Sequence, residues 1–331
     1  MTDMQPQLPK VSILIPVFNR KGYIAECIQS ALDQTFTDFE VVVVDNASDD
    51  GTWEICQKFA SLDQRVRIFR NASNIGPVRN WRRCAHEAQG EFSKILFSDD
   101  CLEPNCLSEM VPMLEDPEIA FVFCAVRIGK MKENSHVSYS HPKLSKMKTR
   151  QFINLTIERK APVSPGAVLI RTKDLLRNLH LNFMSSTPRN YEKNGAGPDV
   201  MIMLLTSQHY PFVSSIFTPL VYFRDHAGSF STNNLNNEIV KGYQSVIAFF
   251  LKKNYGQFSW LNYLAFNWIQ KLIFTQKLSS LRLYLSTHEG TGSLKETLIF
   301  ALLIFIKIIY QILRKIKNNI MTSVAKNNQF K

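Results

Sequence analysis

The first hundred residues alternate apolar runs of strand length with segments of helical periodicity, and this order constrains the fold more than any other feature of the sequence. Strands are expected over 11–17, 40–44, 66–69 and 94–98. Helical spacing of apolar residues lies between them, over 22–33, at Ile55, Phe59 and Leu62, and from Pro77 to the helix stop at Gly90. Near-continuous apolar runs are typical of parallel strands buried on both faces. The pattern therefore predicts an α/β fold with a doubly wound, mostly parallel sheet flanked by helices.

Two of these strands end abruptly in carboxylates. Asp45 follows the run 41–44, and Asp99 with Asp100 follows the run 94–98. Ligands of open α/β sheets bind outside the carboxyl ends of the strands, and neighbouring parallel strands bring those ends to one rim. Clustered carboxylates suit a hard divalent cation that accompanies a phosphorylated ligand. The sequence thus predicts a cation-assisted binding site at this rim.

The regular alternation loosens after residue 100. We expect strands over 119–126 and 168–170, a late strand within 213–223, a helix over 199–207, and long loops with a helix of uncertain extent over 129–165. Residues 236–285 are expected to be helical, without repeats or a low-complexity linker. The predicted organisation is an α/β domain over 1–232 and a helical C-terminal extension over 233–331.

The cysteines and the net charge indicate which cellular compartment and which binding partners to expect. The six cysteines lie in the first 124 residues without CxxC spacing, which indicates reduced, buried thiols. The polar start offers no signal-peptide core, so we expect a cytoplasmic protein. The net charge of +11 concentrates over 127–160 and near the C-terminus, without interleaved aromatic residues or a reader motif, so nucleic acid is not an expected partner. A phospholipid surface, a polyprenyl-phosphate acceptor or a solvated basic face explains the charge equally.

An amphipathic helix is expected near 294–318. Its apolar core over 297–313 contains Lys307 and is shorter than the roughly 20 apolar residues of a membrane span. From Lys307 onward, polar residues fall on one arc, as in helices that lie in the membrane interface. The pattern favours peripheral association with the inner face of the membrane; the alternative is a helix packed on the protein's own core.

Four short motifs follow one another in a fixed order: Pro16-x-x-Asn19, the run 44–52 that contains Asp45, Asn74-Ile75-Gly76-Pro77-x-x-Asn80, and Phe97-Ser98-Asp99-Asp100. Each motif alone is weak, but the ordered set closely resembles the GT-A glycosyltransferases of family 2 over 10 to about 125 and again over 165–232. The resemblance implies the GT-A type of α/β fold and an inverting, metal-dependent hexosyltransferase.

The resemblance also implies a donor site. Pro16, Val17 and Asn19 would border the nucleotide sugar. Asp45 would accept a hydrogen bond from the base, most naturally the imide of uracil or thymine, although a turn or capping aspartate is the alternative. Asp100 would ligate Mn²⁺ or Mg²⁺ on the donor diphosphate, and Asp99 would face the ribose. Phe97 stands where another Asp is common, which leaves fewer protein ligands for the metal.

Further roles implied by the resemblance fall on residues that also have plainer explanations. Asn74, Gly76 and Arg79 would border the nucleotide, Gly76 because backbone approaches closely there and Arg79 because it can reach phosphate, unless Arg79 is a solvated helix charge. Asp199 would be the catalytic base, with Pro198 in the place of the usual Glu; an ordinary helix-start Asp is the alternative. His226 would be an additional metal ligand, or else a structural histidine. Gly166 would lie on the acceptor side of the site.

The expected function is transfer of one sugar from a nucleoside-diphosphate sugar, of UDP or dTDP type, to a hydroxyl of a glycan or polyprenyl-phosphate-linked acceptor in bacterial surface polysaccharide synthesis. Processivity is not expected because no Gln-x-x-Arg-Trp motif follows residue 230. P-loop and dinucleotide motifs are absent, and a nucleotidyltransferase would open with a Gly-rich basic loop where this chain has 16–20. The alternative is a non-catalytic sugar-nucleotide-binding protein on a degenerate GT-A fold.

Overall fold

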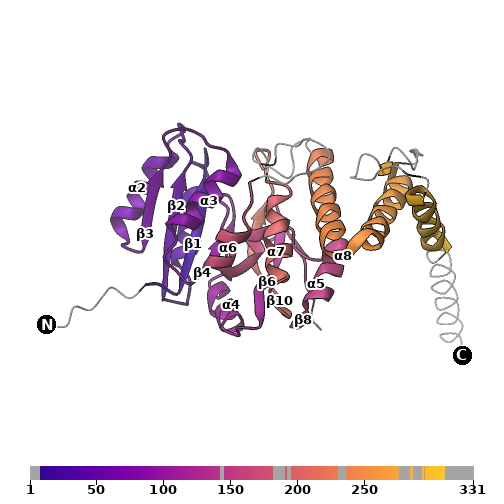
Figure 1. The fold of residues 1–331 in the computed structure, drawn as a ribbon. Helices are drawn as coiled ribbons and strands as arrows, with labels where there is room; N and C mark the ends of the chain where they lie inside the picture. The colour runs from indigo at the N-terminus through magenta and orange to yellow at the C-terminus, as the bar shows by residue number, and fades with distance from the viewer. Residues whose placement is uncertain are drawn as a thin grey trace, which may run out of the picture. The chain divides into compact units, whose positions relative to one another are not determined.

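Four parallel strands form the first half of the central sheet in the computed structural model, in the order β3-β2-β1-β4 (Figure 1). Their bounds are β1 Val11–Val17, β2 Phe39–Asp45, β3 Val66–Arg70 and β4 Phe92–Ile95. Every residue of β1 and β2 is buried, as expected of strands that helices cover on both faces. The structure describes residues 8–141, 145–181, 191, 195–229, 236–275, 284–285, 293 and 295–309.

The prediction for the fourth strand was wrong at its end. β4 stops at Ile95, whereas 96–98 were expected to continue it. Instead the chain turns, and the amide of Asp100 donates a hydrogen bond to the carbonyl of Phe97 over 2.9 Å. Asp99 therefore lies in a turn and Asp100 closes it, so neither residue directly follows a strand end.

The second half of the sheet mixes strand directions. β9 (Val168–Arg171) lies antiparallel between β4 and β6 (Ile119–Gly129), and β10 (Phe212–Arg224) pairs with β6 in parallel. Three short antiparallel strands complete it: β5 Cys101–Leu102, β7 His136–Ser138 and β8 Lys146–Lys148. The helix expected within 129–165 is α5 (Thr149–Ile157), whereas β7 and β8 lie where loops were expected; residues 142–144 lie outside the described residues.

Helices cover both faces of the sheet, which confirms the doubly wound α/β prediction. The first face packs against α1 Ile24–Leu32, α2 Thr52–Leu62 and α4 Cys106–Leu114. The second face carries α3 Pro77–Glu87, α6 Thr172–Asn178 and α7 Pro198–Ser207. All six cysteines are buried and free of disulfides, as predicted.

The chain divides into two units, which are described separately. The first comprises Met1–Phe183 and Asn190–Tyr243, and the second comprises Met184–Arg189 and Gln244–Lys331. The helix α8 (Asn236–Thr275) is interrupted by non-helical backbone at Gly256, with φ of 77°.

The second unit contains a further helix over 295–309, while residues 310–318 of the predicted amphipathic helix lie outside the described residues. Lys307, expected to point away from the apolar face, is half-buried with its ammonium 5.6 Å from the centre of the Phe266 ring. None of the helices formed by described residues carries an apolar stretch that could span a bilayer.

Candidate active site

A cavity of about 760 Å³ lies in the first unit, at the carboxyl ends of the sheet strands. Residues that follow or end β1, β2, β4, β6 and β10 line it, together with the start of α7. The acidic lining residues are Asp99, Asp100, Asp199 and Asp225, and the basic ones are Arg20 and Arg224. This is the rim at which the sequence predicts a ligand site.

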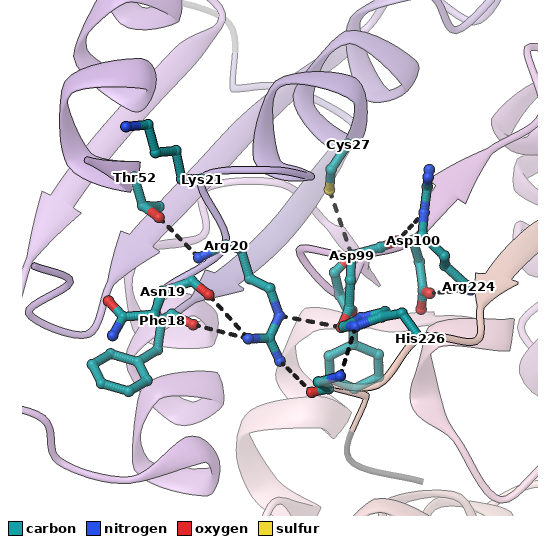
Figure 2. Close-up of polar contacts among 12 residues, drawn as sticks. Phe18, Asn19, Arg20, Lys21, Cys27, Thr52, Asp99, Asp100, Arg224 and His226 are labelled. Carbon is teal, nitrogen blue, oxygen red and sulfur yellow. Dashed lines mark hydrogen bonds and ion pairs between the residues drawn. The ribbon is translucent and has the colours of Figure 1, made fainter. Parts of the chain in front are cut away.

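Asp99 joins two segments that are far apart in the sequence. Its Oδ2 accepts from Arg20 Nε over 3.2 Å and contacts His226 Nε2 over 3.0 Å. Figure 2 shows these three side chains pointing toward one another, and Arg20 also donates to the carbonyl of Gly228 over 3.3 Å. Asp99 thus ties the loop after β1 to the segment after β10.

Asp100, the next residue, is buried and also lines the cavity. Its side chain accepts a hydrogen bond from the backbone amide of Arg224 over 2.9 Å. Burial, and then the charge of Asp99, raises the pKa of Asp100 well above its usual value. Arg20 pairs with Asp99, whereas the described hydrogen-bond donor to the Asp100 side chain is a backbone amide, so a divalent cation can supply further positive charge to this pair of carboxylates.

The donor set therefore fits a cation held by few protein ligands. Carboxylate oxygens are the ligands that Mn²⁺ and Mg²⁺ favour. Within the described ranges, no group of three or more His, Cys, Asp or Glu side chains converges as a metal cage. Most of the coordination would then come from water and a bound diphosphate.

Asp199 occupies the first turn of α7 and is only 6% exposed. Its Oδ1 accepts from the amides of Gly197 and Val200 over 2.8 and 2.7 Å, and its Oδ2 accepts from the hydroxyl of Tyr243 over 2.7 Å. Burial raises the pKa of Asp199 to about 7, against the opposing effect of these hydrogen bonds. A carboxyl group with this pKa is suited to remove a proton at neutral pH.

Glycine residues shape the loop that leads to Asp199. Gly195 and Gly197 have φ of 69° and 135°, a region that favours glycine. A Cβ atom at Gly195 would also overlap the indole ring of Trp81. The loop can therefore lie against Trp81 only with glycine at 195.

Replacement of Gly195 by alanine is expected to destabilise the fold by about 2 kcal/mol, because the methyl group combines backbone strain with overlap of a packed ring. Chemical denaturation measures this change. Gly22→Ala is the matched control, since no atom lies within 4 Å of its added Cβ. Equal stability of the two variants would contradict the steric argument.

Asp45 ends β2, completely buried, but it does not line the cavity among the described residues. Its Oδ2 lies 3.0 Å from Arg70 Nε, and both carboxylate oxygens accept from the amide of Ser48 over 3.3 and 3.2 Å. The next residue, Asn46, does line the cavity. The structure thus places the side chain of Asp45 beside the cavity wall and holds it there by an ion pair.

A network of asparagine side chains fixes this side of the cavity. Asn46 donates to Asn74 and accepts from Asn71, each over 2.8 Å, and Asn71 also donates to Asn80 over 2.8 Å. Asn80 in turn donates to the carbonyl of Val44 over 2.9 Å. The loop 71–76 is thereby tied to the end of β2, which explains why these amides recur in the motifs.

The structure gathers about half of the predicted site residues around the cavity. Those that line it are Pro16, Val17, Asn74, Asp99, Asp100 and Asp199. Those that do not are Asn19, Asp45, Gly76, Arg79, Gly166 and His226. Asn19 instead bonds to Asp49, and Arg79 lies on the exposed side of α3.

Phe97, the departure from the family pattern, belongs to an apolar wall of the cavity. Its ring centre lies 5.4 Å from that of Trp81, which lines the same cavity. A Cβ atom at Gly166 would be 3.2 Å from Phe97 and 3.1 Å from Phe223, so glycine there leaves room for both rings. Gly166 therefore makes room for the two rings of this wall without lining the cavity itself.

Sequence reasoning missed several lining residues, among them Arg20, Trp81, Tyr139 and Tyr243. Arg20 directly follows the first strand and its motif, so its position was a usable signal. Tyr139 and Tyr243 lie in segments without a strand-end or turn pattern that points to a site. Only the folded chain brings them to Asp199.

Comparison with known proteins identifies the family. The model of glycosyl transferase family 2 matches residues 12–179, slightly more than half of the 331-residue chain. The putative teichuronic acid biosynthesis glycosyltransferase TuaG of Bacillus subtilis is 30% identical over 115 residues, covering 35% of this chain and 46% of that protein. A Campylobacter jejuni protein, GalNAc(5)-diNAcBac-PP-undecaprenol beta-1,3-glucosyltransferase, is 34% identical over 105 residues, covering 31% of this chain and 34% of that protein.

The matched segment spans less than half the length of each of these relatives. Among solved structures, S. aureus TarS 1-349 in complex with UDP superimposes with a TM-score of 0.60 at 18% identity, covering 82% of this chain and 75% of that one. This likeness shows the GT-A type of fold. Together with the family match and the ordered motifs, it establishes that the chain belongs to glycosyl transferase family 2.

Proposed function

We propose that this protein transfers one sugar from a nucleoside-diphosphate sugar to a hydroxyl group of a glycan or lipid-linked acceptor, with inversion at the anomeric carbon. One observation carries the proposal: an acidic pair, Asp99 and Asp100, and a separate buried carboxyl group, Asp199, line the same cavity. The first suits a diphosphate with its cation, and the second suits proton removal. Family membership supports the same reaction class.

The donor side of the cavity has the groups that a nucleotide sugar requires. Asp100 and Asp99 would hold Mn²⁺ or Mg²⁺, which would supply positive charge to the departing diphosphate. Arg20 lines the cavity next to Asp99 and can contact phosphate oxygens. His226 contacts Asp99 and would orient this carboxylate or join the coordination.

We favour a UDP or dTDP donor. Asp45 is completely buried and does not line the cavity, so its carboxylate would accept from the imide N–H of uracil or thymine after a local shift at the end of β2. A carboxylate has about four acceptor positions, and Ser48 and Arg70 use three of them. Arg70 holds that carboxylate beside Asn46, at the cavity wall. The TarS structures with UDP and with UDP-GlcNAc support the same donor class for this fold.

Asp199 performs the proton transfer in this scheme. It accepts the proton of the acceptor hydroxyl, whose oxygen attacks the anomeric carbon from the face opposite the diphosphate. Asp199 and the acidic pair come from different elements, α7 and the turn after β4, and both face the cavity. The carbohydrate product is therefore inverted relative to the donor.

The acceptor is proposed to be a glycan or a polyprenyl-phosphate-linked sugar of bacterial surface polysaccharide synthesis. The names of the Bacillus subtilis and Campylobacter jejuni relatives support this class. Ser164 and Trp81 line the cavity and would face the acceptor with a polar and an apolar surface respectively.

The experiment that tests this function is a thermal-shift panel of nucleoside diphosphates with and without Mn²⁺. A ligand that binds only the folded state raises the melting temperature, and at one ligand concentration the increase is larger for the ligand with the lower dissociation constant. UDP or dTDP is expected to stabilise the protein in the presence of Mn²⁺ more than GDP or ADP. Absence of stabilisation by every nucleotide would overturn the donor assignment and favour a degenerate fold without this ligand.

We further propose that the helix 295–309 docks on the inner face of the membrane. Its exposed apolar side chains recur at helical spacing and are 37% to 61% exposed; they are Leu298, Leu302, Phe305, Ile306, Ile308 and Ile309. Such a face is typical of helices that lie in a lipid interface. A membrane-bound acceptor would then be within reach of a peripheral enzyme.

Cosedimentation with anionic phospholipid vesicles tests this docking. The full-length protein is expected to pellet with vesicles, and the double variant Leu302→Ser with Phe305→Ser to remain largely in the supernatant, because it loses buried apolar area. Leu62→Ser, another exposed leucine in the first unit, is the control. Equal binding of all three proteins would exclude this helix as the anchor.

A further inference from the structure

Tyr243 lies against the proposed base in a manner that the sequence motifs do not foresee. The tyrosine is on α8, outside the segment matched by the family model, and it lines the cavity together with Asp199. Its hydroxyl donates to Asp199 Oδ2 over 2.7 Å. A charge-assisted O–H···O⁻ bond of this length is among the stronger hydrogen bonds in proteins.

The three described donors leave Asp199 with one acceptor position. Oδ1 receives the amides of Gly197 and Val200, and Oδ2 receives the hydroxyl of Tyr243. A carboxylate has about four acceptor positions. The remaining one is on Oδ2, so the Tyr243 hydroxyl decides from which side an acceptor alcohol can approach.

The backbone next to Tyr243 packs closely against the loop that precedes Asp199. A Cβ atom at Gly242 would overlap the carbonyl oxygen of Ala196, so α8 lies directly on the loop that precedes Asp199. Gly242 and Ala196 therefore fix the distance between the hydroxyl group and the carboxylate. The contact joins residues 44 positions apart in the sequence.

We propose that Tyr243 is a positioning residue for the base: its hydroxyl group holds the Asp199 carboxylate in one rotamer, with a single oxygen position open to the acceptor, and favours its ionised form. This inference rests on the proposed function of Asp199. It assigns Tyr243 no contact with the reacting atoms.

The surroundings agree with this role. A hydrogen bond to the ionised form lowers the pKa of a carboxyl group, and the Tyr243 bond opposes the effect of burial on Asp199. Burial and the charge of Asp199 raise the pKa of the Tyr243 hydroxyl well above its usual value, so it stays a donor. Among the described residues, Tyr139 after β7 also faces Asp199, and burial and the same charge raise the pKa of its hydroxyl. The charged residues that line the same cavity are Arg20, Asp99, Asp100, Arg224 and Asp225.

The test is the pH dependence of transfer by Tyr243→Phe, which removes only the hydroxyl. The acid limb of kcat is expected to move upward by about one pH unit, and kcat at pH 7 to fall roughly fivefold, with recovery at higher pH. KM for the donor should stay unchanged, because Tyr243 does not contact the acidic pair. Tyr210→Phe is the matched control, since it removes a 2.6 Å hydrogen bond to Asp174 outside the cavity.

A second variant keeps the test valid if Tyr243→Phe folds poorly. A 3-fluorotyrosine at 243 has a more acidic hydroxyl and a stronger donor, so the acid limb should move downward. An unmoved acid limb in both proteins would overturn the inference. The dependence of the melting temperature on pH is a readout that does not require turnover. The pH at which stability is lost as Asp199 ionises should move upward in Tyr243→Phe and downward with 3-fluorotyrosine at 243.

Failure of the inference is distinguishable from failure of the proposed function. If Asp199→Asn keeps its turnover, the base assignment itself is wrong. If Asp199→Asn is inactive while the acid limb of Tyr243→Phe matches that of the unchanged protein, only the role of Tyr243 is wrong.

Discussion

Replacement of Asp199 by asparagine is expected to lower sugar transfer by about a thousandfold while donor binding stays intact. Asparagine is nearly isosteric and can still accept from the amides of Gly197 and Val200, so the start of α7 should keep its structure. It cannot take up a proton, however. Turnover with a glycan acceptor and the thermal shift by nucleotide with Mn²⁺ measure the two expectations separately.

Asp174→Asn is the matched control for this variant. Asp174 is also buried, and it also accepts from a tyrosine hydroxyl, that of Tyr210, but outside the cavity. Transfer by the control should remain near that of the unchanged protein. Near-normal transfer by Asp199→Asn would contradict the base assignment.

The same variant has a pH-dependent effect on stability. The pKa of Asp199 is raised from 3.8 to about 7 in the folded state, so its contribution to stability is complete below pH 4 and is lost as pH rises through 7. Asparagine cannot ionise and avoids this loss. The melting temperature of Asp199→Asn relative to the unchanged protein should therefore rise between about pH 4 and pH 7 and level off above pH 7.

Replacement of Asp100 by asparagine is expected to abolish the stabilisation by nucleotide with Mn²⁺ and to lower transfer by about a hundredfold or more. The amide can still accept from the backbone of Arg224, but it loses the charge that a divalent cation requires. Because burial and the charge of Asp99 disfavour the ionised form of Asp100, the neutral amide should not destabilise the free protein.

Asp63→Asn is the control for Asp100→Asn. Asp63 pairs with Arg65 over 2.7 Å at the end of α2, away from the cavity. Its substitution should leave nucleotide binding unchanged. Full Mn²⁺-dependent stabilisation of Asp100→Asn would show that the cation, if bound, is held elsewhere.

The elements of the first half of the fold could be predicted because their periodicity is local. The apolar run of β1 is observed with its predicted bounds, and the helices from α1 to α3 lie within the predicted segments. The end of β4 was wrong because apolarity continues through Leu96 and Phe97, both of which remain buried or partly buried in a turn. An apolar run indicates that a segment is buried, but it does not by itself distinguish a strand from a buried turn.

The cavity-lining residues that the sequence indicated are carboxylates that follow an apolar run or open a helix. Asp99 and Asp100 follow such a run, Asp199 opens α7, and all three line the cavity. Asp45 has the same local signal, yet its ion pair with Arg70 turns it toward the wall, and a contact between two strands leaves no trace in a local pattern. Tyr243 has no local signal because its role arises from a contact with α7.

The central claim is that one cavity seats a metal-bound diphosphate beside Asp100 and directs the anomeric carbon toward Asp199. Crystallographic analysis of the protein with Mn²⁺ and a non-hydrolysable UDP-sugar analogue tests it most directly. We expect the diphosphate and the cation next to Asp99 and Asp100, with the sugar between them and Asp199. A nucleotide bound outside this cavity, or a sugar facing away from Asp199, would contradict the account.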